Sequence, residues 1–543
     1  MSAWRGRLAL GLLPLALVGC AAAREPAAAT AERAAPVPDD AAALHVLQRV
    51  TYGPRPGDVA RVRAVGVGAW LERQLDPDRI DDTAVEQALR ALPTLTMSIA
   101  DLQRDYPRLD PELQRKLASG EMTPRELREQ YPTDKRPGRI VAELQTARML
   151  RAVNSERQLQ EVMVDFWFNH FNVFANKGEV RWYVTAYERD VIRPHALGRF
   201  PDLLRATARH PAMLYYLDNW LSVRPGYTVR TGPNQGRRAG LNENYARELL
   251  ELHTLGVDGG YTQADVTEVA RAFTGWSINR PRQDAHFVFR PGTHDVGEKR
   301  VLGYSIRAGG ERDGEQILDL LAGHPTTARF IARKLVRRLV ADEVPPALVE
   351  RVATAYRTTG GDIRAMLRVI FAAPEFQAPA AAGAKIKKPS EFVVSATRAV
   401  GATVDARGAW ALARATAEIG EGLYEAVPPT GHADRAEAWV NPGALLSRMN
   451  FALALADGRL PGVRSDLGTL VGDADRRQPR AVLEQLLTGL LHGRSSPQTR
   501  AVLIAQLDQP EITRLTADDR GPANTDVGKL AALVLGSPEF QRR

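Results

Sequence analysis

The chain has 543 residues, 44% of them hydrophobic, which is enough apolar material for a large core and suggests two or more lobes. Its formal net charge of +8 is small for this length, so we expect no nucleic-acid partner. A preference for an anionic lipid or polymer also fits this charge. The single cysteine, Cys20, excludes disulfides, thiolate zinc sites and a cysteine nucleophile.

Residues 1–19 have the pattern of a lipoprotein signal peptide. Arg5 and Arg7 form a positive region, residues 8–18 form an apolar region, and a small-residue cleavage site ends in Cys20. The apolar run is too short to span a bilayer. We therefore expect cleavage before Cys20, lipidation of that residue, and stable attachment of the protein to a membrane through the lipid.

The segment after the cleavage site indicates where the anchor lies. Ala21, rather than Asp, follows the cysteine, and the resemblance to Gram-negative lipoproteins implies the outer membrane of such a bacterium. Residues 20–40 are rich in alanine and proline and poor in large apolar residues, which predicts a flexible tether.

From residue 41 onward, helical signals dominate. Apolar residues recur at helical spacing between glycine, proline and capping residues. These segments are 139–154, 156–175, 178–192, 241–254, 263–274, 325–340, 361–372, 389–400 and 444–456. They predict a mainly α fold, a large multi-helix assembly in two lobes, residues 41–380 and 381–543. The lobe boundary rests on Pro-Glu-Phe-Gln, which follows an apolar run at both 374–377 and 538–541.

Two segments depart from the helical pattern. Residues 286–290, followed by Pro-Gly-Thr and then by 299–302, predict one short β-hairpin-like excursion as the only sheet. Residues 222–240 form a loop rich in glycine, proline and arginine between helices. The sequence leaves open whether this loop is a lid, a binding loop or a disordered segment.

A polar stripe runs through an aromatic helical segment. Asp165, Asn169, Asn172 and Asn176 are spaced at i, i+4, i+7 and i+11, and therefore share one face of a helix. Because buried polar groups need hydrogen bonds, this stripe either joins neighbouring helices or lines a cavity. His170, beside the stripe, is either an acid/base or ligand residue or a satisfied core histidine.

Residues 241–253 hold the densest group of ionisable side chains. Glu243, Arg247 and Glu251 are spaced for i,i+4 ion pairs on a solvent-facing side. If a second lobe covered that side, the carboxylates held by Arg247 could act as acid and base. Glu248 and His253 lie about 140° apart on an α-helical wheel, so they do not chelate one ion.

The preferred single locus for chemistry is His294-Asp295, in the loop of the extended excursion with Lys299 nearby. A histidine and a carboxylate suffice for proton transfer or for two ligands to a divalent ion, so a divalent metal is possible. The alternative is a capped turn without chemistry.

A basic helical face is the other charged feature. It is predicted to be solvated, or to bind an anionic lipid or polymer. Its members are Arg329, Arg333, Lys334, Arg337 and Arg338. The common nucleotide-binding, nucleophile-elbow and zinc-protease motifs do not occur in the chain.

Several runs resemble a bacterial family known as domain of unknown function 1800. They are LQRVTYGPRPGDV, WFNHFNV, HPAMLYYLDN, LNENYARELLELHTLGVDGGYTQADVTEVARAFTGW, HDVGEKRVLG, HPTTARFIARKLVRRLV and LLSRMNFALAL, and they span residue 45 to the end. The resemblance implies export, a helical fold and an exported partner protein, and it implies no agreed activity. Family members tend to have Gly-Trp where this chain has Gly431-His432, which implies altered packing of that loop.

Two functions remain open. The first is an envelope enzyme that uses acid/base or metal-assisted chemistry, such as a hydrolase, on an envelope or extracellular polymer. The alternative is a non-catalytic lipoprotein that holds an exported partner at the membrane. The enzyme requires its residues to meet in one cleft. Its expected catalytic residues are His294, Asp295, His170, Glu248 and Glu251, with Asp165, Asn169, Asn172 and Arg247 for binding.

Overall fold

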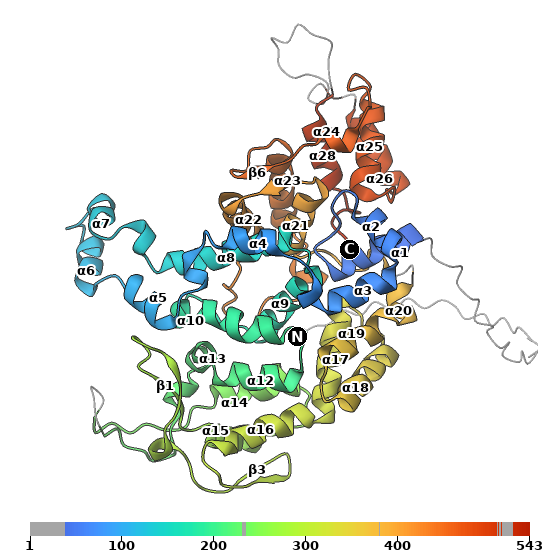
Figure 1. The fold of residues 1–543 in the computed structure, drawn as a ribbon. Coiled ribbons are helices and arrows are strands. Elements are labelled where there is room, and N and C mark those ends of the chain that lie inside the picture. Colours follow the sequence, from blue (N-terminus) through green and yellow to red (C-terminus); the bar gives the residue numbers. More distant parts are fainter. Residues whose placement is uncertain (1–38, 231–234, 379–380, 508, 510–511, 513–524) are drawn as a thin grey trace, which may run out of the picture. The chain divides into compact units, whose positions relative to one another are not determined.

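The structure is a computed structural model that describes residues 39–230, 235–378, 381–507, 509, 512 and 525–543. The expected signal peptide, Cys20 and nearly all of the expected tether lie outside these residues, so the predictions about them stay predictions. Figure 1 shows helices along the whole described chain and only short strands. The prediction of a mainly α fold is therefore confirmed.

The helices fall into three runs along the chain. Before the expected polar stripe are α1 Asp39–Val50, α2 Asp58–Val65, α3 Val67–Leu75, α4 Thr83–Leu89, α5 Ile99–Asp105, α6 Pro111–Ser119 and α7 Pro124–Gln130. The middle run is α8 Gly138–Asn154, α9 Gln158–His170, α10 Val180–Ala186, α11 Arg193–His195, α12 Phe200–Arg209, α13 Pro211–Tyr216, α14 Asn244–Glu248, α15 Gln263–Ala272, α16 Arg312–Gly323, α17 Pro325–Leu339, α18 Pro346–Thr359, α19 Ile363–Phe371 and α20 Pro374–Gln377. The last run is α21 Pro389–Ala399, α22 Ala406–Ile419, α23 Pro442–Ala456, α24 Gly468–Val471, α25 Pro479–Leu491, α26 Pro497–Gln506 and α28 Val527–Leu535.

Helix starts follow from local side-chain chemistry. At α15, the hydroxyl of Thr262 accepts a hydrogen bond from the backbone N–H of Asp265, and the Asp265 carboxylate accepts one from the backbone N–H of Thr262. This reciprocal pair satisfies two N–H groups that have no partner inside the helix. The sequence pattern Thr-Gln-Ala-Asp therefore sets the start of α15.

Helix α9 ends five residues earlier than the sequence predicts, at His170 instead of residue 175. Beyond it, the backbone N–H of Ala175 donates to the carbonyl of Tyr424 at 3.0 Å, so a distant loop replaces the helical hydrogen bonds. Asn172 and Asn176 consequently lie off the helix, and the prediction that they extend its polar stripe is wrong.

Two predicted helices change type midway. Helix α10 continues as the π-helix η4 Tyr187–Ile192, and α14 continues as the π-helix η6 Leu249–Thr254. Because a π-helix has more residues per turn, the α-helical wheel used for Glu248 and His253 does not hold beyond Glu248. π-Helical turns often occur at functional sites.

Three small antiparallel sheets occur in the described residues. They pair β1 Trp276–Asn279 with β2 His286–Phe289, β3 Lys299–Val301 with β4 Tyr304–Ile306, and β5 Thr403–Val404 with β6 Val463–Arg464. The prediction of one hairpin joining 286–290 to 299–302 is therefore wrong. Leu302 and Gly303 both have positive φ, which allows the two-residue turn that joins β3 to β4 instead.

The loop at 222–240 is bonded to itself where it is described. Val229 N–H donates to the carbonyl of Arg237, and Ala239 N–H donates to the carbonyl of Tyr227, both at 2.9 Å. Residues 231–234 lie outside the described chain, so the choice between a lid, a binding loop and a disordered segment remains open.

Helices on both sides of residue 380 share one core. Helices α21 and α22 pack against α8, and the main hydrophobic cluster extends from Val46 to Phe540. The described chain clusters into one compact unit. A lobe boundary near residue 380 thus stays a prediction. No helix in the described residues combines the length and the apolar character that crossing a bilayer requires.

Candidate functional site

The asparagines after Asp165 attach the loop 421–435 to helix α9. Asn169 donates through Nδ2 to the carbonyl of His432 at 2.8 Å and accepts through Oδ1 from the His432 N–H at 2.7 Å. Asn172 donates to the carbonyls of Ala426 and Pro428, both at 3.0 Å. The expected polar stripe therefore binds a loop that is more than 250 residues away in sequence.

Gly431 is required where this loop approaches α9. Its φ is 69°, and a Cβ atom built there would lie 2.4 Å from the backbone oxygen of Asn169. No side chain fits at that distance, so the loop meets the helix through glycine.

A pocket of about 260 Å³ lies between α9, α17 and this loop. We call it the α9–α17 pocket. Its lining carries more cations than carboxylates, which favours a positive potential inside. The cations of the lining are Lys334, Arg337, Arg338, Lys388 and Arg435, and its carboxylates are Asp165 and Asp434.

This placement corrects the prediction of a solvated basic face on α17. Arg329 is exposed and pairs with Glu350 at 2.7 Å, as a solvated residue would. Arg338 is buried, and Lys334 and Arg337 are partly buried in the pocket. Only one edge of the basic helix therefore faces solvent.

The pocket cations Arg338 and Lys388 are neutralised by buried carboxylates. Arg338 pairs with Glu391, and Lys388 pairs with Asp165 at 2.7 Å and with Glu421 at 2.9 Å. Asp165 also accepts from Arg148 at 2.7 Å. These ion pairs form a rigid charged wall rather than free binding groups.

Asp165 is a permanent negative charge in this wall. Burial acts to raise the pKa of Asp165, but Lys388, Arg148 and Arg338 together lower that pKa well below its usual range. A carboxylate this weakly basic does not accept a proton near neutral pH. We therefore assign Asp165 a positioning role.

Lys334, Arg337 and Arg435 are the pocket cations that form no ion pair with a carboxylate in the described residues. Arg337 makes one long hydrogen bond, 3.4 Å from Nε to the carbonyl of Asp342. Asp434, which lines the pocket from the loop, pairs with Lys385 at 3.2 Å. The pocket thus holds positive charge that a bound anion would neutralise.

Lys334 contacts His170 directly. Its Nζ donates to Nδ1 of His170 at 2.8 Å, while Nε2 of His170 donates to the carbonyl of His253 at 3.1 Å. Burial, together with Lys334 and His253, lowers the pKa of His170 well below its usual range, so the ring is neutral. The two contacts fix which nitrogen carries the proton.

Lys334 itself titrates close to physiological pH. Burial lowers the pKa of Lys334 to about 8, with Asp434 acting against the shift and Arg337 adding to it. At this value both the neutral amine and the ammonium are populated near neutral pH. A group of this kind can accept or donate a proton during a reaction.

The π-helix η6 supplies the carbonyl that holds His170. It places His253 next to the aromatic ring of Phe171, with ring centroids 5.0 Å apart. Burial lowers the pKa of His253 to about 3, and its Nε2 has no hydrogen-bond partner in the described residues. His253 therefore supports the site through its backbone oxygen.

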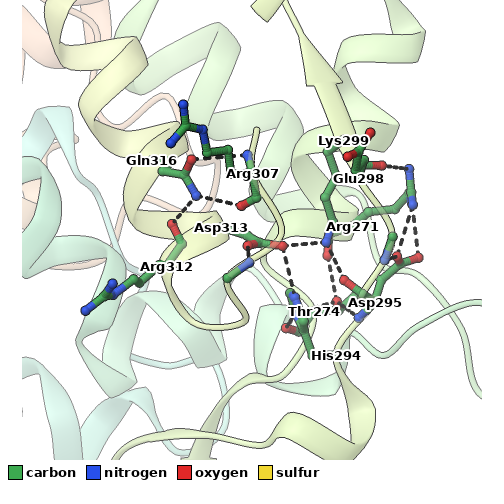
Figure 2. A network of polar contacts seen from close by, with 12 residues as sticks. Arg271, Thr274, His294, Asp295, Glu298, Lys299, Arg307, Arg312, Asp313 and Gln316 are labelled. Atoms are coloured by element: carbon green, nitrogen blue, oxygen red, sulfur yellow. Dashed lines mark hydrogen bonds and ion pairs between the residues drawn. The ribbon is translucent and has the colours of Figure 1, made fainter. Parts of the chain in front are cut away.

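His294 and Asp295 belong to a different, closed network, which Figure 2 shows. Nε2 of His294 lies 3.1 Å and Nζ of Lys299 lies 2.5 Å from the same carboxylate oxygen of Asp313. These three side chains are 1%, 0% and 0% exposed. The network joins the loop after β2 to the start of α16 and leaves no surface for a substrate.

Asp295 is also committed to structure. Its carboxylate accepts two hydrogen bonds from Arg271, both at 3.0 Å, and one from the N–H of Gly297 at 3.0 Å. Burial acts to raise the pKa of Asp295, but the Arg271 hydrogen bonds reverse that effect and lower it. Neither His294 nor Asp295 lines the α9–α17 pocket.

The other expected residues also lie away from this pocket. Arg247 pairs weakly with Glu243 at 3.4 Å, and Glu251 accepts from the hydroxyl of Tyr261 at 3.4 Å. Burial and the neighbouring Glu251 raise the pKa of Glu248. Among the described residues, no group of three or more His, Cys, Asp and Glu side chains is arranged to hold a metal ion.

The structure therefore brings together only part of the expected site. Asp165, Asn169 and His170 line one pocket, and Asn172 fixes its loop, whereas His294, Asp295, Glu248, Glu251 and Arg247 do not line it. Lys334 and His432 complete the pocket. The only sequence signals for them are the basic face of α17 and the departure at Gly431-His432.

Comparison with known proteins gives a family and no activity. The model of a family described as a protein of unknown function, DUF1800, matches residues 45–542. No curated protein and no solved structure matches the chain. Since the match spans nearly the whole sequence, the chain belongs to the DUF1800 family.

Proposed function

We propose that this chain is a cell-envelope lipoprotein whose α9–α17 pocket binds an anionic group of an envelope or extracellular polymer and carries out acid/base chemistry on it, as a hydrolase does. The observation that supports this most is the 2.8 Å contact between Lys334 and the neutral His170 in a pocket with unpaired cations.

Substrate binding in this proposal depends on Lys334, Arg337 and Arg435. None of them pairs with a carboxylate in the described residues, and guanidinium and ammonium groups suit carboxylate and phosphate oxygens. An anion held there lies among all three, because they line the same pocket. The positive potential also attracts a charged polymer from solution.

Proton transfer in this proposal belongs to Lys334. The neutral amine accepts a proton from a water or hydroxyl that attacks the polymer, and the resulting ammonium donates it to the leaving oxygen. His170 orients the amine through Nδ1, and its own Nε2–H is fixed on the His253 carbonyl. His170 is thus a positioning residue.

The remaining expected residues divide into two groups. Asp165, Asn169 and Asn172 keep a place in the proposal because they hold the pocket wall and its loop. His294, Asp295, Glu248, Glu251 and Arg247 do not, because they line no part of this pocket.

The proposed location follows from the N-terminus. The signal-peptide pattern and the cysteine at position 20 support lipid anchoring, and Ala21 supports the outer membrane. The alanine- and proline-rich segment up to residue 40 would then let the folded unit reach a polymer near the membrane.

The non-catalytic alternative has one observation in its favour. Val440, Leu445 and Leu446, around the start of α23, are 45%, 43% and 63% exposed. Exposed apolar residues that cluster in this way mark protein contact surfaces. In that case an exported partner binds at α23, and the α9–α17 pocket recognises an anion without chemistry.

The test measures binding and cleavage of two polymers, polygalacturonate and polyphosphate, by the purified full-length protein. Binding is followed by calorimetry, and cleavage by the appearance of new chain ends. The variant is Lys334→Met, which removes the amine and keeps the stem. The control is Arg329→Gln, an exposed cation on the same helix that pairs with Glu350.

We expect the wild type and Arg329→Gln to cleave one polymer, and Lys334→Met to lose about 100-fold of that activity. Binding that depends on Lys334 without any cleavage would replace the enzyme proposal with the recognition role. Absence of binding to both polymers, or equal binding by Lys334→Met, would overturn the assignment of the pocket.

A further inference from the structure

A second pocket, also of about 260 Å³, is lined by α1, α21, α25 and the chain before and after them. We call it the α21–α25 pocket. Leu490, Leu491 and Phe540 give it apolar walls, and Lys387 lies among them. None of its lining residues belongs to the α9–α17 pocket.

Lys387 is a buried cation without a partner. It is 5% exposed, and its Nζ makes no hydrogen bond or ion pair within the described chain. It lies instead over the ring of Phe540, 3.9 Å from the ring centroid. The next residue, Lys388, is paired with two carboxylates, so the two adjacent lysines have opposite environments.

The surroundings of Lys387 disfavour its charge. Burial lowers the pKa of Lys387 to about 7; Glu391 acts against this shift, and Arg543, Arg448 and Arg494 add to it. A buried ammonium without an anion is costly, and an anion that enters the pocket removes that cost.

No side chain of the pocket supplies that anion. The Glu539 carboxylate accepts from the N–H of Ser496 and the hydroxyl of Thr499, both at 2.9 Å. Arg494 and Arg542 are exposed and bonded to neutral oxygens, on Gln48 and Gly383. The pocket therefore offers a buried positive charge, apolar walls and no internal carboxylate for that charge.

We propose that the α21–α25 pocket binds a small carboxylate with an apolar tail. The carboxylate pairs with Nζ of Lys387, and the tail packs against Leu490, Leu491 and Phe540. One buried ammonium matches one carboxylate, whereas a phosphate dianion would need more donors than the buried part of the pocket provides. This site is independent of the function proposed for the α9–α17 pocket.

The test measures hexanoate binding to the full-length protein by calorimetry. Hexanamide, which has the same tail without the charge, and inorganic phosphate, which has the charge without the tail, serve as comparison ligands. The variant is Lys387→Met. The control Lys135→Met removes an exposed lysine, and Lys334→Met reports binding of hexanoate to the other pocket.

We expect hexanoate to bind the wild type, Lys135→Met and Lys334→Met alike, and to bind Lys387→Met at least about tenfold more weakly. Hexanamide and phosphate should bind the wild type at least about tenfold more weakly than hexanoate. Equal affinity of hexanoate and hexanamide, tighter binding of phosphate, or no effect of Lys387→Met would overturn the proposal.

Proton uptake gives a second readout that a general loss of structure does not imitate. At pH 8 the Lys387 amine is mostly neutral, and a bound carboxylate favours the ammonium, so binding should take up close to one proton. Calorimetry in buffers of different ionisation enthalpy measures this number, and no uptake would contradict pairing with Lys387. If Lys387→Met does not fold, Ala399→Phe, which fills the pocket, must abolish hexanoate binding.

Discussion

The charged cluster around Asp313 and the charged cluster around Asp165 each hold a buried carboxylate between buried basic side chains. At Asp313, one carboxylate oxygen accepts from His294 and Lys299, and the other accepts from the N–H of Gly309 at 2.6 Å. At Asp165, Arg148 and Lys388 neutralise the carboxylate in a similar way. The second cluster borders a pocket with further cations that pair with no carboxylate in the described part of the chain.

This difference separates structure from function in this fold. A histidine, a carboxylate and a lysine in contact are not sufficient for a site, because at Asp313 their hydrogen bonds are all used internally. The α9–α17 pocket has space together with charge that the protein does not balance. We take that combination as the mark of the functional site.

The largest expected effect is on stability when either cluster loses its carboxylate. Asp165→Asn removes one of the two carboxylates that pair with Lys388 and one of the two that pair with Arg148. Asp313→Asn removes the carboxylate that pairs with Lys299. Each should lower the free energy of unfolding by about 3–5 kcal/mol, measured by urea denaturation. A loss below about 1 kcal/mol in either variant would show that its cluster is not the closed ionic unit described here.

Lys387 should behave in the opposite way, because it is a buried charge without a carboxylate. Its pKa is about 7 in the folded protein against 10.5 for an ordinary lysine, so the wild type gains stability as the pH rises from 7 to 10.5. The free energy of unfolding of Lys387→Met should therefore be about 2–4 kcal/mol higher than that of the wild type at pH 7, and this difference should vanish near pH 10.5. Destabilisation at pH 7 would contradict the unpaired state of Lys387.

Acid should destabilise the fold through the buried histidine next to the pocket. The folded pKa of His253 is about 3, below the ordinary 6.5, so only the unfolded chain binds its proton between these values. Stability should therefore fall as the pH decreases from 6.5 toward 3. Between pH 7 and pH 4.5, the free energy of unfolding of His253→Phe should fall by about 2 kcal/mol less than that of the wild type, measured by thermal or urea unfolding. Identical acid sensitivity would show that His253 is not buried and neutral.

A smaller effect is expected where α9 holds its loop. Asn169→Ala removes both hydrogen bonds to His432 and should cost about 1–2 kcal/mol of stability. Because the loop carries Arg435, polymer binding should weaken as well. The control is Thr96→Ala, an exposed residue that hydrogen-bonds only locally. Binding that remains unchanged in Asn169→Ala would indicate that the loop does not form the pocket.

Much of the fold is predictable from the sequence because helix patterns are local. The sequence predicts helices at 325–340 and 263–274, and α17 spans Pro325–Leu339 and α15 spans Gln263–Ala272. The end of α9 is not predictable in this way. It depends on the carbonyls of Tyr424 and its neighbours, which accept hydrogen bonds from the chain after α9 and lie far away in sequence.

The site is less predictable for the same reason. A helical wheel places Lys334 on a basic face but does not show that the loop 430–435 and α9 cover that face. The pair His294-Asp295 looks reactive in sequence, yet the partner that encloses His294 is Asp313, nineteen residues later. Candidate catalytic and binding residues can be identified in a sequence, but their burial and their partners depend on the tertiary structure.

The central claim is that anions bind at Lys334 and not near His294. The most direct test compares the affinity of polygalacturonate for Lys334→Met and for Asp295→Asn at one low ionic strength, where electrostatic binding is strong. We expect at least about tenfold weaker binding for Lys334→Met and wild-type affinity for Asp295→Asn. Weaker binding by Asp295→Asn with no change in Lys334→Met would contradict it.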